Sequence, residues 1–177
     1  PSETMDAPWR LTADRIAYDS TREIYTAQGN VILRMGQQRL SADRVQFNRS
    51  TGEAVATGNV RLTAGSDWLM GDRLDINIET ETGTLYRGLV FIEETHFYIR
   101  GDRIEKTGPA TYAINHAALT SCDGKQPDWR ITGDHVKITV EGFGTVRDGA
   151  FWVRKLPILY VPYFRFPVKL KRQTGFL

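Results

Sequence analysis

Five aspartates recur along the sequence in a regular series, and a series of carboxylates is a pattern that can bind cations. Each is followed directly by an arginine or a histidine, and single carboxylates at strand corners usually bond to the nearby backbone. We therefore expect a structural role and no bound metal. The five are Asp14, Asp43, Asp72, Asp102 and Asp134.

The histidines do not extend this pattern to a metal centre or a catalytic site. They lie far apart in the chain, at His96, His116 and His135, and none stands at metal-ligand spacing from another or from the single cysteine. No serine, cysteine or lysine has an identifiable base in reach, and Gly142-Phe143-Gly144 follows no dinucleotide-binding fingerprint. We expect no catalytic residue, no cofactor and no enzymatic activity.

Cys122 is the single cysteine of the sequence, so it cannot form an internal disulfide. It is therefore buried, reactive, or paired with a cysteine outside this sequence. The residues alone favour a buried thiol.

The composition is that of a globular domain with a substantial core, with 177 residues of which 41% are hydrophobic and 25% are charged. The net charge of +2 is spread over alternating signs, so we expect no nucleic-acid partner. No stretch approaches the roughly 20 apolar residues of a spanning helix, and Pro1 opens on no secretory signal. We expect the numbering to start inside a trimmed or processed product.

The aspartates mark a repeated unit that determines where the other elements must lie. Each stands inside a copy of one pattern, in which an apolar run leads to Ala-Asp or Gly-Asp and a second apolar run follows, as in Gln38–Phe47. Successive aspartates are 29, 29, 30 and 32 residues apart, which is the self-similarity of a stacked array.

The apolar residues of each copy alternate as on a half-buried strand, but the alternation changes parity at the aspartate. In the second copy Leu40 has an even number, whereas Val45 and Phe47 have odd numbers. One extra residue restores the inward orientation where a strand bends through a bulge into a second, facing sheet. The small Ala or Gly fits a crowded corner, and we expect the Asp side chain to bond backbone N–H groups left unpaired by the bend.

These features predict an all-β protein with almost no helix, because no window shows sustained apolar spacing at a period of about 3.6 residues. Turns such as Asn48–Gly52 separate the strands. We expect five bent hairpins stacked edge to edge into a β-jellyroll of V-shaped cross-section, with two facing antiparallel sheets. Apolar residues would point into the gap, and strand edges would remain open at both ends of the stack.

Three segments are expected along the chain. Residues 1–8 are a polar lead-in, residues 9–155 hold the five repeats, and residues 156–177 form a cap and linker rich in proline and aromatic residues. Because proline cannot donate to a ladder, the stretch from Pro157 to Pro167 is predicted to be an edge strand or a capping excursion. Its aromatic residues would also suit a membrane interface.

The Ala-Asp-Arg and Gly-Asn-Val elements resemble the OstA-like periplasmic domain of the lipopolysaccharide-transport proteins. Three further motifs are similar to the LptD family of outer-membrane lipopolysaccharide-assembly proteins, in the region just before their β-barrel. These are Thr120-Ser121-Cys122 followed by Pro127-Asp128-Trp129, the segment Pro157 to Pro167, and the terminal Arg172 to Leu177. The resemblance covers nearly the whole chain and implies a fragment that ends before the barrel begins.

The resemblance implies a conduit at the periplasmic face of the outer membrane of a Gram-negative cell, which binds the acyl chains of lipopolysaccharide and passes the lipid to a β-barrel. The implied partners are a periplasmic bridge protein of the same fold, adding a strand near Leu11 to Tyr18, the chain's own C-terminal β-barrel, and its plug lipoprotein. The resemblance also implies that Cys122 pairs with a cysteine in the barrel. Some members carry another cysteine toward the N-terminus, and this sequence has none there.

The interior of the jellyroll would form the lipid path. Each CH₂ group exposed to water costs about 0.8 kcal/mol, so an acyl chain needs an apolar route. For any single inward residue, ordinary core packing is the alternative role. The inward candidates are Ile16, Tyr18, Val31, Leu33, Val45, Phe47, Val60, Leu62, Leu74, Ile76, Val90, Ile92, Ile104, Val136, Ile138, Phe151 and Val153.

Three other functions are open on the residues. The chain would be a self-standing lipopolysaccharide bridge protein of the same fold if no barrel follows it. It would be a polysaccharide-active enzyme if the repeats formed a right-handed β-solenoid, which usually has shorter rungs with acids clustered on one face. It would be a structural spacer if its core were dry and packed.

Overall fold

The structure is a computed structural model that describes residues 10–139 and 142–167. The expected lead-in, the linker beyond Pro167 and the terminal motif from Arg172 to Leu177 lie outside these ranges. All regular elements in the described ranges are β-strands. None of the described residues forms a helix able to cross a membrane. The strands are β1 (Arg10–Thr12), β2 (Arg15–Asp19), β3 (Ile24–Met35), β4 (Gln38–Asn48), β5 (Glu53–Ala64), β6 (Asp67–Asn77), β7 (Thr82–Ile92), β8 (Phe97–Gly108), β9 (Thr111–Thr120), β10 (Trp129–Thr139), β11 (Phe143–Val153) and β12 (Leu156–Pro167).

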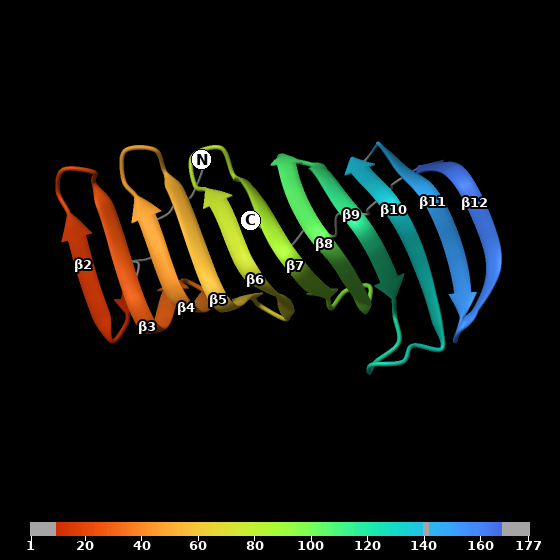
Figure 1. Cartoon of the computed structure of the whole chain (residues 1–177), viewed down its shortest axis with the longest axis horizontal. Coiled ribbons are helices and arrows are strands. Elements are labelled where there is room, and N and C mark those ends of the chain that lie inside the picture. Colours follow the sequence, from red (N-terminus) through yellow and green to blue (C-terminus); the bar gives the residue numbers. More distant parts are fainter. Residues whose placement is uncertain (1–9, 140–141, 168–177) are drawn as a thin grey trace.

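The strands form one antiparallel sheet that runs in chain order from β1 to β12 (Figure 1). β1 and β2 both pair with β3, and they are the two halves of one edge strand interrupted at Ala13 and Asp14. β12 pairs with β11 over nearly its whole length and forms the other edge. The predicted all-β architecture of stacked hairpins is confirmed.

The long strands bend near their middle, and from β3 to β6 the register slips there by one residue. Gln28 pairs with Arg44 and Val31 pairs with Ala42, so that two residues of β3 oppose the single Asp43 of β4. The same slip recurs between β5 and β6. In each case the two residues that oppose one aspartate are a Gly-Asn pair, and both residues of the pair have left-handed backbone angles. The parity change in the sequence thus coincides with β-bulges from β3 to β6, whereas from β6 to β11 the strands bend without a register slip at their middle.

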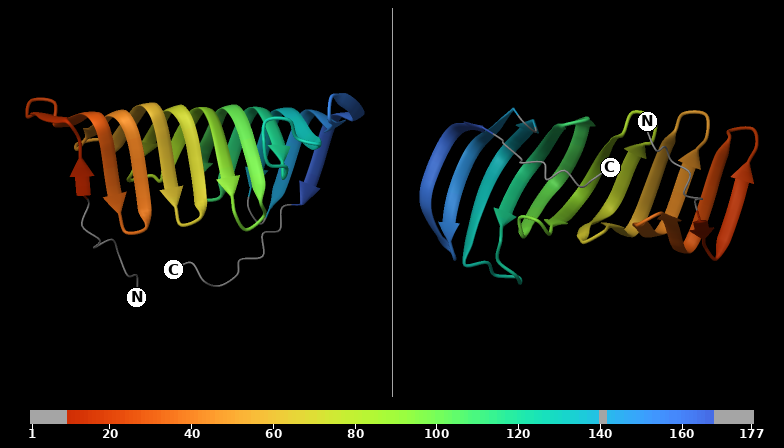
Figure 2. Two further views of the ribbon diagram at one scale, coloured as in Figure 1. Left: turned by 90° about the horizontal axis from the view of Figure 1, so that it is seen from below. Right: turned by 180° about the vertical axis from the view of Figure 1, so that it is seen from behind.

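The bends fold the continuous sheet so that its two halves face each other (Figure 2). The predicted V of two facing sheets is thus made by two halves of a single sheet. Small residues line the inside of the fold, as expected. A Cβ added to Gly71 would lie 2.6 Å from Leu85, and one added to Gly101 would lie 2.6 Å from Ile114. Only glycine leaves room there for the larger side chains of the next strand.

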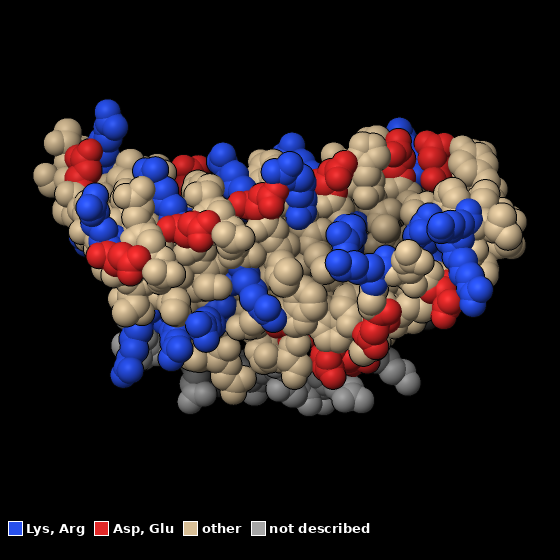
Figure 3. Space-filling view, turned by 60° about the horizontal axis from the view of Figure 1, so that its bottom comes forward, with Lys and Arg blue, Asp and Glu red and all other residues tan. Residues whose placement is uncertain are grey.

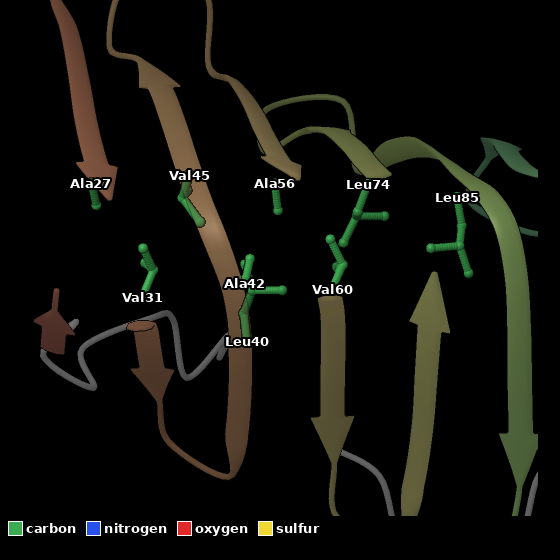
Figure 4. Packing of buried hydrophobic residues seen from close by; sticks show 9 residues of the cluster. All are labelled: Ala27, Val31, Leu40, Ala42, Val45, Ala56, Val60, Leu74 and Leu85. Carbon is green, nitrogen blue, oxygen red and sulfur yellow. The ribbon is translucent and has the colours of Figure 1, made fainter. Parts of the chain in front are cut away.

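The hydrophobic core lies between the two halves and is best packed from β3 to β7. Side chains from one half, such as Val45 and Leu74, point toward Val31 and Val60 from the other half (Figure 4). Val31 and Val60 are each only 1% exposed. The core ends toward the last strands, where Ile131 and most apolar residues of β12 are exposed.

Candidate functional site

The inner face of the sheet carries unbroken rows of apolar residues across the whole stack. Directly opposed residues of antiparallel strands share a face, so the register can be followed from strand to strand. One row runs from Leu11 on β1 through Leu40 and Val90 to Phe151 and Leu159, and each of its members is Leu, Val, Ile or Phe. A second row, in the other half of the sheet, runs from Ile16 through Val45, Leu74 and Ile104 to Phe164.

All seventeen residues expected to line the interior map to this one face when the register is followed. Their burial nevertheless differs widely. Four are buried, namely Val31, Val45, Val60 and Leu74. Ten are half-buried, namely Leu33, Phe47, Leu62, Ile76, Val90, Ile92, Ile104, Val136, Ile138 and Phe151. Three are exposed, namely Ile16 at 52%, Tyr18 at 46% and Val153 at 42%, and these lie on or next to the two edges of the sheet.

Several inward residues were missing from the sequence-based set. Leu40, Leu85 and Ile114 are buried on the same face. The alternation around Ala42 could have identified Leu40, because it lies two residues away on the same face. Leu85 lies between two glycines of β7, at positions 83 and 88, and these hide the alternation of that strand.

The outside of the fold carries a row of polar residues in which the five aspartates alternate with side chains of the neighbouring strands. Asn30 donates to Asp14 and Asn59 donates to Asp43, each from Nδ2 to Oδ2 over 2.9 Å. Arg87 forms an ion pair with Asp72. The expectation that the aspartates bond the backbone is therefore corrected for these three pairs, in which the partner of the aspartate is a side chain on the next strand.

His116 completes this row by bridging two aspartates. Its Nδ1 lies 3.0 Å from Asp102 and its Nε2 lies 3.1 Å from Asp134. Like Asn30 and Asn59, His116 has a left-handed backbone angle, at φ 49°. The equivalent position thus holds Asn in two repeats, Arg in the third and His in the fourth. In the described ranges, no group of three or more His, Cys, Asp or Glu side chains is arranged to hold a metal ion.

Cys122 lies half-buried in the loop between β9 and β10 and is a free thiol. The pKa of its thiol is lowered because the backbone amide of Trp129, and to a smaller extent the Thr120 hydroxyl, hydrogen-bond to the sulfur. The next residue, Asp123, accepts from Tyr98 Oη at 2.6 Å and lies 3.1 Å from His96 Nε2. These bonds lower the pKa of the Asp123 carboxyl and fix the loop against the turn between β7 and β8.

An aromatic cluster on the outer face next to this loop was not predicted. Trp68 stacks on Phe91 with ring centroids 5.5 Å apart, and Phe91 contacts Tyr98 at 4.7 Å. The three residues come from β6, β7 and β8 and lie in register. They lie on three different strands, and no local pattern in the sequence joins them.

An open surface pocket of about 540 Å³ lies on the outer side of β5 to β8, and most of its lining residues are polar. Its lining includes Glu53, Arg73, Asp75 and Glu105. It is separate from the apolar interior, since most of its lining residues belong to the opposite face of the sheet. The apolar inner face, unlike this pocket, extends through every repeat of the described chain.

Comparison with known proteins places these features in a family. Residues 42–142 match the family model described as "LptA/(LptD N-terminal domain) LPS transport protein". The LPS-assembly protein LptD of Acinetobacter baumannii is 34% identical over 102 residues, which are 56% of this chain and 12% of that protein. The LptD of Xylella fastidiosa is 42% identical over 64 residues, which are 36% of this chain and 8% of that protein.

Among solved structures, the chain is similar to LptH of Pseudomonas aeruginosa, described as the LptA homologous periplasmic component of the conserved lipopolysaccharide transport device. The TM-score is 0.49 at 16% identity, and the match covers 56% of this chain and 76% of that one. The matched segments are thus a small part of the LptD relatives' own length and most of the LptH chain.

Proposed function

The chain belongs to the LptA/(LptD N-terminal domain) LPS transport protein family, and from this premise we propose that it is a conduit for lipopolysaccharide at the periplasmic face of an outer membrane. In this proposal the acyl chains lie between the two halves of the sheet and move along its inner face. The lipid passes from a bridge protein at the β1–β2 edge toward a β-barrel beyond β12.

The observation that carries the proposal is the continuous apolar row from Leu11 to Leu159. It presents an aliphatic or aromatic side chain on every strand that it crosses. An acyl chain that leaves water gains about 0.8 kcal/mol for each buried CH₂, and a row without a polar interruption keeps that gain constant along the path. A structural core needs apolar residues only where the two halves pack, whereas this row continues into strands whose inner residues are exposed.

The burial pattern supports a slot that is filled by side chains from β3 to β7 and open at the last strand. From β3 to β7 the side chains of the two halves fill the gap between them, and a lipid must displace them there. Leu159 and Phe164, on the last strand, are more than half exposed and available to a ligand without rearrangement. Exposed apolar surface of this kind is typical of a lipid or protein contact.

The two edge strands of the sheet differ in sequence and so suit different partners. The β1–β2 edge contains no proline and is open to strand addition by a chain of similar fold. β12 contains Pro157, Pro162 and Pro167, which remove backbone donors, and its apolar side chains are exposed. We therefore assign β12 to contact with a barrel and its plug lipoprotein. The alternative is a self-standing bridge protein, in which both edges would add strands.

Site-specific photocrosslinking tests the conduit. A benzophenone amino acid is placed at Phe47 or Ile76 on the inner face and, as matched controls, at Gln46 or Asn77 on the outer face, and the purified chain is irradiated with lipopolysaccharide. We expect adducts at the inner positions and none at the outer ones. Equal labelling of both faces, or none at either in a folded chain, would refute the conduit.

A further inference from the structure

Three arginines stand side by side on the outer face of the first strands. In the register, Arg10 of β1 lies opposite Arg34 of β3, and Arg34 lies opposite Arg39 of β4. Directly opposed residues share a face and have Cβ atoms about 5 Å apart. Because neighbouring Leu33 and Leu40 point inward, the three arginines point outward. We call Arg10, Arg34 and Arg39 the arginine ladder.

The ladder has no ion-pair partner among the described residues. All three side chains are exposed, and the ion pairs of the described chain join residues from Asp72 onward. Like charges directly opposite each other on a sheet are destabilising. The ladder therefore places three positive charges together without a described carboxylate to offset them.

Later repeats show that the fold can supply such a carboxylate. On the outer face of β6, Arg73 pairs with Asp75 at 2.6 Å, and on β8, Arg103 pairs with Glu105 at 2.5 Å. In both pairs the acid lies two residues further along the same strand and so on the same face. The positions two residues from Arg34 hold Ile32 and a turn glycine, so the ladder is open to an external anion.

The ladder lies at the rim of the fold. β3 ends at Met35 and β4 begins at Gln38, so Arg34 and Arg39 each stand one residue from the turn that joins them. Figure 3 shows lysine and arginine side chains gathered along this edge, over the N-terminal strands. An amphiphile whose acyl chains lie between the two halves leaves its headgroup at such a rim, within reach of long arginine side chains.

From the proposed function and this geometry, we infer that the arginine ladder binds phosphate groups of the lipopolysaccharide headgroup while the interior takes the acyl chains. Guanidinium groups form bidentate, charge-assisted hydrogen bonds with phosphate oxygens, and adjacent guanidiniums can share one phosphate. Arg34 has an arginine on both sides and is the central contact.

The test compares Arg34→Gln and Arg34→Lys with a matched control, Arg44→Gln. Arg44 is also exposed on the outer face and forms no ion pair with a described carboxylate, but Gln28 and Thr57 flank it in register. Affinity is measured by titration with lipopolysaccharide and with the same lipopolysaccharide after enzymatic dephosphorylation. Glucose 1-phosphate, followed through the arginine Nε–H signals by NMR, probes the ladder without any acyl chain.

We expect Arg34→Gln to bind phosphorylated lipopolysaccharide about three- to fivefold more weakly, Arg34→Lys to lie between it and the parent chain, and Arg44→Gln to bind like the parent. Dephosphorylation should abolish the difference between variants. Glucose 1-phosphate should shift the ladder signals and not that of Arg44. Without ligand, Arg34→Gln should be at least as heat-stable as the parent, since a repulsion is removed.

Equal weakening by Arg34→Gln and Arg44→Gln, a difference that survives dephosphorylation, or a less stable Arg34→Gln chain would overturn the ladder as a phosphate site. These results would leave the conduit intact if the chain still binds the lipid. Conversely, ladder shifts with glucose 1-phosphate in a chain that binds no lipopolysaccharide would keep the anion site and remove the proposed function.

Discussion

Replacing Gly58 with alanine should lower the free energy of unfolding more than the same change at a glycine with open surroundings. Gly58 stands in the bulge of β5 at φ +76°, and an added Cβ would lie 2.8 Å from the Cβ and Cγ of Asp43 and closer still to its Oδ2. The Asp43 side chain cannot move away from the added Cβ without losing a hydrogen bond, because its Oδ2 accepts from Asn59 Nδ2 over 2.9 Å.

The expected loss has two parts. An L-residue in the left-handed region costs about 1–2 kcal/mol, and loss of the Asp43–Asn59 hydrogen bond costs about 0.5–1.5 kcal/mol more. The free energy of unfolding should therefore fall by about 2–3 kcal/mol. For a chain of this size that corresponds to a decrease in Tm of roughly 5–10 °C.

Gly36→Ala is the matched control, because Gly36 also has a positive φ, at +55°, but nothing lies within 4 Å of its added Cβ. It should show only the first part of the loss. Both variants are measured by urea denaturation followed by circular dichroism, together with Gly58→Ala in an Asp43→Gly background. The reasoning is refuted if the two glycine variants lose equal stability, or if the Gly58 and Asp43 changes are strictly additive.

Three further outcomes follow from the fold and the site. His116→Asn should retain most of the stability that His116→Ala loses in urea denaturation, since Asn tolerates the left-handed conformation and can hydrogen-bond to an aspartate as it does in the first two repeats. Equal losses in the two variants would contradict the role of His116 as the partner of the aspartates. Val45→Asp should lower the unfolding free energy by several kcal/mol or prevent folding, whereas Gln46→Asp, its outward neighbour, should change it by less than about 1 kcal/mol; similar effects would contradict the inner face. Because the pKa of Cys122 is lowered, the pH midpoint of its alkylation by iodoacetamide should lie below that of the urea-unfolded chain, in which the hydrogen bond from the Trp129 amide is lost; coincident midpoints would show that the loop does not hold the thiolate.

The bend and the inner face could be predicted because alternation records orientation directly. Leu40 and Val45 of β4 differ in parity, and the register with the neighbouring strand slips between them. The partner of each aspartate could not be read in the same way. Asn30 lies sixteen residues after Asp14, on another strand, and in the sequence it marks only an interruption of the apolar run. The repeat of that same separation between Asp43 and Asn59 was the available signal.

Burial along the inner face could not be predicted from the residues. Val60 is 1% exposed and Val153 is 42% exposed, although both are valines on the same face. The difference depends on how closely the opposite half of the sheet approaches, which is a property of the whole stack. For the same reason, alternation could identify the lining of the slot but not where the slot is filled by its own side chains.

Residues on the outer face were the least predictable. Trp68 and Phe91 lie on outward positions, where parity favours polar residues, yet they pack together across the register. The arginine ladder likewise depends on three strands whose pairing no local pattern gives. Contacts between side chains of neighbouring strands on the outer face therefore required the structure, whereas the orientation of residues along one strand was visible in the sequence.

The most direct test of the conduit is to observe contact between acyl chains and individual methyl groups. The chain is prepared deuterated, with protonated Ile, Leu and Val methyl groups, and intermolecular NOEs to lipopolysaccharide methylenes are recorded by NMR. The account predicts NOEs at Leu62 and Ile76 on the inner face and none at Ile32 and Leu89 on the outer face. NOEs confined to the outer methyl groups, or absent everywhere in a folded chain saturated with lipid, would contradict it.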